Sequence, residues 1–66
     1  MKELCVKLMC DKHITIEEVE SVILRDYPGC KILSCNESIL PDVLEDEETG
    51  ERMVIYVYYA HIRKEN

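Results

Sequence analysis

The chain has 66 residues, with 14 Asp and Glu against 8 Lys and Arg and a formal net charge of −6. A chain of this length forms a single domain (residues 1–66) with a thin core, since it buries only about 60% of the surface that its unfolded form exposes. The acidic balance disfavours direct binding to nucleic acid, and no apolar run approaches the ~20 residues of a membrane-spanning helix. Because the first residues also lack a signal-peptide pattern, we expect a cytoplasmic protein with reduced cysteines and no membrane attachment.

The first half of the chain predicts a strand followed by a helix. Residues 4–10 alternate between two faces, one of them made of Leu and Val, as a strand with one face on the core does. Thr15 and Glu18 have the spacing of a capping box, which predicts that a helix begins here. Its apolar stripe consists of Ile16, Val19, Ile23 and Tyr27. Pro28 and Gly29 then predict the end of the helix.

The second half of the chain predicts two strands joined by a hairpin. Residues 32–40 alternate as a second strand, and Pro41, which donates no ladder hydrogen bond, places that strand at a sheet edge. The segment Glu47–Gly50 suits a type I turn that ends in a left-handed glycine. Residues 53–62 are rich in Val, Ile and Tyr and predict the last strand, the most apolar of the chain.

Together these elements predict an α+β domain of the βαββ type. A helix that links the first two strands and is followed by a hairpin fits a split βαβ unit, in which the third strand lies between the other two. We therefore expect a three-stranded antiparallel or mixed sheet in the order 1-3-2, with one helix packed on one face. A long acidic hairpin should join the second and third strands.

The last strand carries the first candidate binding surface. Its two alternating sets of side chains are both apolar, and one helix covers only one side of a sheet, so the other side stays exposed. If the odd-numbered set meets the helix, the exposed partner-binding residues are Val54, Tyr56, Tyr58 and Ile62. Exposed apolar patches and tyrosines are typical of protein interfaces, and the simplest partner is a second copy of the chain. The simpler alternative is that tyrosine tolerates half-exposure in any strand.

The acidic hairpin carries the second candidate surface. Its carboxylates, with no Lys or Arg among them, belong to Asp42, Glu45, Asp46, Glu47, Glu48 and Glu51. A field of this sign attracts a protein partner with a basic surface. The same acids also suit a phage-type inhibitor that mimics nucleic-acid charge against a nuclease or nucleic-acid-binding protein. The simpler alternative is a solvated loop that keeps the protein soluble.

The cysteines and histidines predict no catalytic residue, metal ligand or cofactor. Cys5/Cys10 and Cys30/Cys35 are spaced more widely than the paired ligands of structural zinc sites usually are. The expected topology separates Cys10 from Cys30 along the sheet, puts Cys5 and Cys35 on opposite faces, and places neither histidine beside a cysteine. The hairpin acids also lack the pattern of an EF-hand loop.

The sequence therefore predicts a noncatalytic, small acidic protein-binding module that modulates or inhibits a protein partner and acts as a homodimer. The alternatives are the inhibitor by charge mimicry and a cysteine-based metal-binding protein. A sheet whose tyrosines stack RNA bases is disfavoured, because such sheets surround their aromatic residues with Lys and Arg.

Overall fold

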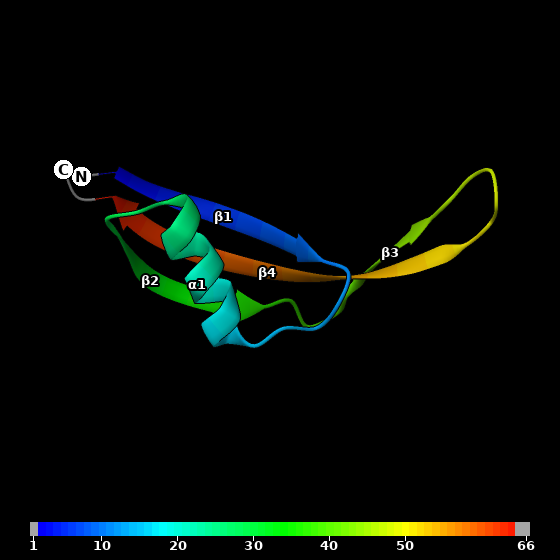
Figure 1. Ribbon diagram of the computed structural model, residues 1–66, viewed down its shortest axis with the longest axis horizontal. Helices are drawn as coiled ribbons and strands as arrows, with labels where there is room; N and C mark the ends of the chain where they lie inside the picture. Colours follow the sequence, from blue (N-terminus) through cyan, green and yellow to red (C-terminus); the bar gives the residue numbers. More distant parts are fainter. Residues whose placement is uncertain (1, 65–66) are drawn as a thin grey trace.

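The computed structural model describes residues 2–64, which form one helix and four strands (Figure 1). In chain order the elements are β1 (Lys2–Cys10), α1 (Ile16–Asp26), β2 (Cys30–Glu37), β3 (Asp42–Glu45) and β4 (Arg52–Lys64). The sheet has the order β1-β4-β2, with β3 also paired to β4, and every pairing is antiparallel. Among the strands of residues 2–64, β4 is therefore the one with which each of the others pairs.

The helix begins and ends where the sequence predicts. The hydroxyl of Thr15 accepts a hydrogen bond from the backbone N–H of Glu18 at 3.2 Å, and the first turn carries acidic side chains that favour the positive end of the helix dipole. At the other end, the N–H of Tyr27 donates to the carbonyl of Ile23 at 2.7 Å. Gly29 follows with a φ of 84°, a conformation that glycine adopts without strain.

The predicted sheet, by contrast, is wrong: residues 2–64 form four strands in the order β1-β4-β2 with β3 on β4, in place of three strands in the order 1-3-2, and the hairpin before β4 starts from β3 and not from β2. The segment expected as one strand over residues 32–40 ends at Glu37 and bends before Pro41. The bend is held by the hydroxyl of Ser38, which donates to the carbonyl of Leu40 at 3.0 Å. The chain then resumes as β3, which pairs with residues 52–55 of β4, and the hairpin joins β3 to β4. Pro41 therefore lies between two strands, and does not only mark one strand as lying at the edge of the sheet.

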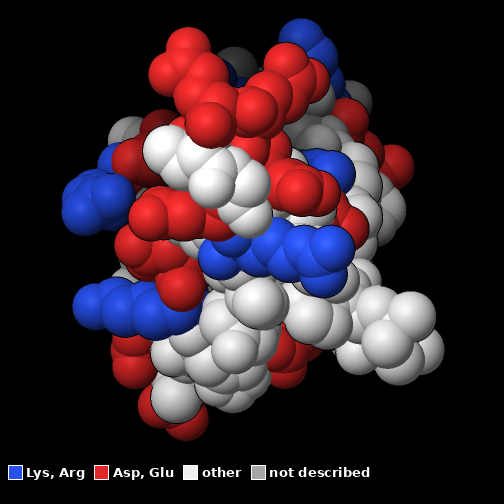
Figure 2. Space-filling view, turned by 90° about the vertical axis from the view of Figure 1, so that its right-hand side faces the viewer, with Lys and Arg blue, Asp and Glu red and all other residues white. Residues whose placement is uncertain are grey.

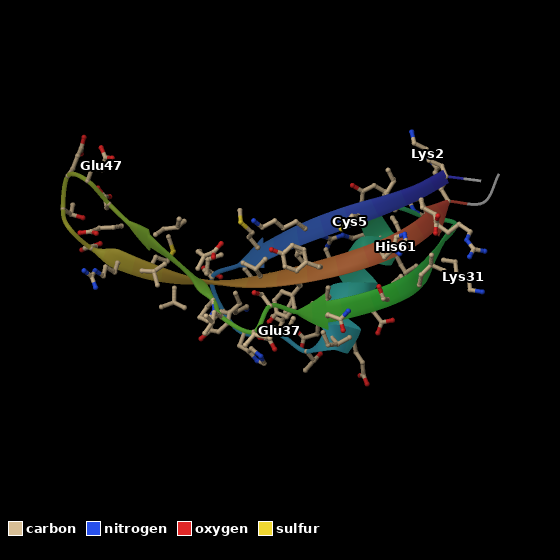
Figure 3. The ribbon with its side chains drawn as sticks, turned by 180° about the vertical axis from the view of Figure 1, so that it is seen from behind. Lys2, Cys5, Lys31, Glu37, Glu47 and His61 are labelled. Carbon is tan, nitrogen blue, oxygen red and sulfur yellow. The ribbon has the colours of Figure 1, made fainter. Side chains whose placement is uncertain are left out.

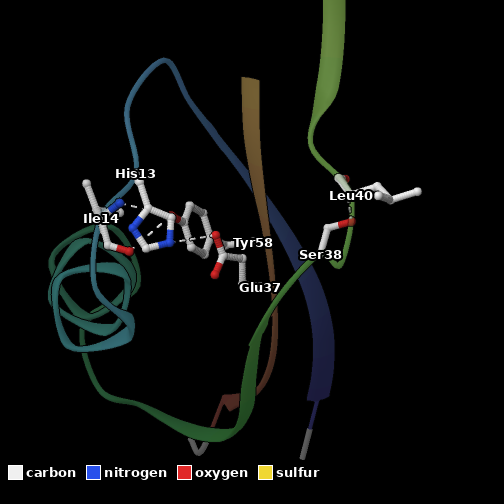
Figure 4. A network of polar contacts seen from close by, with 6 residues as sticks. All are labelled: His13, Ile14, Glu37, Ser38, Leu40 and Tyr58. Atoms are coloured by element: carbon white, nitrogen blue, oxygen red, sulfur yellow. Dashed lines mark hydrogen bonds and ion pairs between the residues drawn. The ribbon is translucent and has the colours of Figure 1, made fainter. Parts of the chain in front are cut away.

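The core lies between α1 and one face of the sheet. Its buried side chains are Val19, Ile23, Tyr58, Ala60 and Ile62. Tyr58 is only 1% exposed, yet its hydroxyl has two hydrogen bonds: it accepts from the backbone N–H of Ile14 at 2.9 Å and donates to the carbonyl of Ile14 at 3.0 Å (Figure 4). The loop between β1 and α1 is thereby fixed to the central strand.

The molecule is elongated, with extents of 47 × 20 × 19 Å, because β4 outlasts its neighbours. Its residues 56–64 pair with β1 and form, with β2 and α1, the body of the protein. Its residues 52–55 pair with β3 alone. The hairpin of residues 42–55, called the arm below, therefore projects from the body (Figure 1).

Replacing Tyr58 by Phe should lower the free energy of unfolding by about 1–2 kcal/mol, because the half-buried N–H and C=O of Ile14 both lose their partner. The matched control is Tyr59→Phe, whose side chain is 42% exposed and should change stability by less than about 0.5 kcal/mol. Urea unfolding followed by circular dichroism measures both. Equal losses in the two variants would contradict the role given to the Tyr58 hydroxyl.

Candidate protein-binding surface

The sheet face that α1 leaves uncovered is the opposite of the one that the sequence predicts to be exposed. Tyr58 and Ile62 are 1% and 0% exposed beneath α1, so their assignment to an open face is wrong. Tyr56 is half-buried, with the ring of His13 edge-on at 5.4 Å between centroids. Of the four residues, only Val54 is exposed, and it lies on the arm. The helix covers the even-numbered set of β4.

The face of the body that α1 leaves uncovered is largely polar. Cross-strand neighbours there include Lys7 and Asn36 on either side of Tyr59, and Cys5 and Ser34 on either side of His61. Tyr59 is 42% exposed, and no other tyrosine belongs to this face of the described sheet. The aromatic strip expected on the open face is therefore reduced to one ring among polar neighbours.

The exposed apolar side chains gather instead on the arm and at its base. Six of the ten large exposed apolar residues fall within residues 39–54. This apolar stem consists of Ile39, Leu40, Val43, Leu44, Met53 and Val54, exposed by 43% to 97%. All four residues of β3 are exposed, and within residues 2–64 no strand pairs with its outer edge. Val43 and Val54 form one cross-strand pair and Leu44 and Met53 the next, so exposed apolar side chains lie on both faces of the hairpin. Apolar surface gathered in one part of a protein is typical of an interaction site.

The acidic residues predicted as a binding surface are all exposed, and five of the six surround the end of the arm. The turn of residues 46–51, called the tip, is ordered by Asp46, whose carboxylate accepts from the N–H groups of Glu48 at 2.8 Å and Thr49 at 3.3 Å. The carbonyl of Asp46 also accepts from Gly50, which has a φ of 74°. The view onto the tip shows acidic side chains gathered over this end of the molecule (Figure 2).

Basic residues collect at the other end of β4. The sheet register pairs Lys2 with Lys64 and Lys31 with Arg63, so four of the eight bases of the chain lie together there. Figure 3 shows Lys2 and Lys31 at the end remote from Glu47. The charge of the molecule is thus polarised along its longest axis, which the count of charges in the sequence does not reveal.

Two hollows accompany the arm. One lies where the arm leaves the body and is lined by Glu37, Ser38, Ile39, Pro41, Tyr56 and Val57. The other lies along the arm and is lined by Leu44, Glu45, Asp46, Glu51, Arg52 and Met53. Both combine apolar side chains with carboxylates, a mixture that suits a protein contact better than a buried small ligand.

The cysteines are separated as expected, with one correction. Cys10 pairs with Tyr56 and Cys30 with Lys64, at opposite ends of the body, while Cys5 is exposed and Cys35 faces the core. The prediction that neither histidine lies beside a cysteine is wrong for His61, which the register places opposite Cys5. The imidazole of His61 lies 3.4 Å from the carboxylate of Glu3. All three groups lie on an exposed face of the sheet.

His13, unlike His61, connects two elements of the fold. Its Nε2 atom lies 2.8 Å from a carboxylate oxygen of Glu37, so the loop before α1 is tied to the end of β2 (Figure 4). Across residues 2–64, no group of three or more His, Cys, Asp or Glu side chains is arranged to hold a metal ion. In the same span, no helix has both the length and the apolar character needed to cross a membrane.

No protein family, curated protein or solved structure matches this chain. The candidate surface therefore rests on the geometry of the arm and its charges.

Replacing Asp46 by Ala should speed amide exchange at Glu48 and Thr49, because both N–H groups lose their acceptor. Global stability should change by less than about 0.5 kcal/mol, since the tip lies outside the core. Glu47→Ala is the matched control, as no hydrogen bond from its side chain is found in the tip. Exchange followed by NMR at single residues measures the effect, and unchanged rates in Asp46→Ala would contradict it.

Alkylation by iodoacetamide near neutral pH should label Cys35 far more slowly than Cys5. Burial, with a smaller contribution from the Glu20 carboxylate, raises the pKa of the Cys35 thiol, so less reactive thiolate is present and labelling should rise only at higher pH. Cys5 is exposed. Peptide mass spectrometry over time compares the two sites, with urea-unfolded protein as the control in which they converge. Equal rates in folded protein would contradict the assignment.

Proposed function

We propose that this protein is a noncatalytic protein-binding module that modulates its partner by associating with it through the arm. The observation that carries the proposal is the apolar stem, a set of side chains exposed on a projecting hairpin that no other element covers in residues 2–64. An isolated two-stranded hairpin is marginally stable in water. Covering Leu44 and Met53 would contribute about 25 cal/mol for each Å² removed from water, and binding would thereby also stabilise the arm.

The tip supports a partner with a basic surface. Its carboxylates lie at one end of the molecule, remote from the basic end. At that end they are accessible to an approaching protein and attract positive charge over roughly 10 Å at moderate salt. The apolar stem behind the tip then supplies the contact energy. Methionine 53 suits such a surface, since its flexible thioether adapts to irregular partners.

The free strand edges support a second mode of contact. The outer edge of β3 is unpaired within residues 2–64, and so is the side of residues 52–55 that faces away from β3, because β1 pairs with β4 only from residue 56 onward. An extended segment of a partner can add to such an edge through backbone hydrogen bonds.

The arrangement of the acids favours steering over mimicry of nucleic acid. Glu47, Glu48 and Glu51 cluster around one turn instead of running along a face at regular intervals, as successive phosphates do. The cysteines favour no metal-binding alternative either, since Cys10 and Cys30 lie at opposite ends of the body.

The test compares the double variant Leu44→Ser/Met53→Ser with Leu24→Ser in affinity capture from the source cell, quantified by mass spectrometry. Leu24 is 47% exposed on α1, close to the 52% and 50% of Leu44 and Met53, so the control removes one apolar side chain of similar exposure from another part of the molecule, whereas the arm variant removes two. Captured protein, untagged copies of the chain included, should fall on the order of tenfold in the arm variant and stay unchanged in the control. Equal capture by both variants would overturn the proposal.

A further inference from the structure

Opposite charges lie on the two sides of the centre of β4, the acidic tip beyond Arg52 and the lysines at the Lys64 end. The strand runs from Arg52 to Lys64, so Tyr58 is its midpoint and each end lies roughly 20 Å away at ~3.3 Å per residue. Beyond one end is the acidic tip, and at the other end Lys2, Lys31 and Lys64 lie together. All three lysines are exposed, and none has an ion pair within residues 2–64.

We propose that the occupant of the arm is a second copy of this chain, in an antiparallel pair related by a two-fold axis. This inference rests on the proposed function, because it names the partner of the same surface. A two-fold axis near the middle of the molecule's long dimension brings the tip of each copy to the basic end of the other. The acidic tip therefore finds its basic surface on an identical chain.

The antiparallel direction follows from the charges. A parallel pair sets the two tips side by side and the two basic ends side by side, so both contacts are repulsive. The antiparallel pair forms the acidic-to-basic contact twice, as an isologous interface requires. The net charge of −6 opposes association only weakly in this arrangement, since charges of like sign are kept at opposite ends.

The uncovered sheet face supplies the contact between the two ends. Tyr59 and Met9, exposed by 42% and 58%, are the large apolar side chains of this mostly polar face and lie near the midpoint of β4, and Leu44 and Met53 are exposed further out, on the arm. The long dimension of the molecule is 47 Å and the next is 20 Å, so one long face has room for the ~800 Å² per partner that stable interfaces bury. Two sheets packed face to face keep their strands nearly aligned, which an antiparallel pair allows.

The inference is tested by swapping charge at the two ends, separately and together. The tip variant is Glu47→Lys/Glu48→Lys/Glu51→Lys, which leaves Asp46 and its turn intact. The end variant is Lys2→Glu/Lys31→Glu/Lys64→Glu. Sedimentation velocity over a range of concentrations measures association, and circular dichroism checks that each variant is folded. Wild-type protein should dimerise, and each single-end variant should dimerise roughly tenfold more weakly or worse.

The variant with both ends swapped decides the geometry. In an antiparallel pair its basic tip meets an acidic end, so dimerisation should return to near the wild-type strength. A parallel pair would stay repulsive in this variant. Failure of the folded combined variant to recover would overturn the inference, as would association that ignores the single-end changes.

A strictly monomeric wild-type protein at high micromolar concentration would also overturn it. The proposed function would survive that result if Leu44→Ser/Met53→Ser still lost captured protein while Leu24→Ser did not. If neither arm variant nor charge variant altered any association, both proposals would fail together.

Discussion

The structure depends on one mismatch of length: β4 has 13 residues, whereas β1 has 9 and β2 has 8. Backbone hydrogen-bonding groups beyond the body need a partner, and β3 provides it on one side only. The helix is too short to follow the strand outward, so the extension has a ladder but no core. An apolar sequence in this position is thereby left on the surface, and the apolar stem is a consequence of the greater length of β4.

The fold was predictable wherever a local signal had a single interpretation. Thr15 with Glu18 marked the start of the helix, Pro28 with Gly29 its end, and the apolar residues 53–62 indicated a central strand. Pro41 was ambiguous, because a proline marks either the edge position of a strand or an interruption between two strands. Distinguishing these requires knowing that β4 continues past β2, which is a tertiary fact and not a local one.

Periodicity could not show which face of the last strand packs against the helix, because both of its alternating sets of side chains are apolar. Register settles it: Leu8 opposes Tyr58 and Val6 opposes Ala60, so the apolar set of β1 commits the even-numbered set of β4 to the helix. The composition of the two sets held a usable signal. Turning the odd-numbered set inward would bury His61, whereas the even-numbered set offers Ala60, a small side chain over which a helix can pack closely.

The separation of arm and core also bears on how the protein tolerates change. Within residues 42–55 only Ile55, at the base of the arm, is buried, and none of these residues belongs to the cluster beneath α1, so the exposed part of the arm contributes little to the packing that keeps the domain folded. Substitutions at exposed arm residues therefore have little effect on stability, while those at Val19 or Ile23 act on stability first. In a domain this small, the exposed residues of the arm can therefore change in sequence without lowering the stability of the fold.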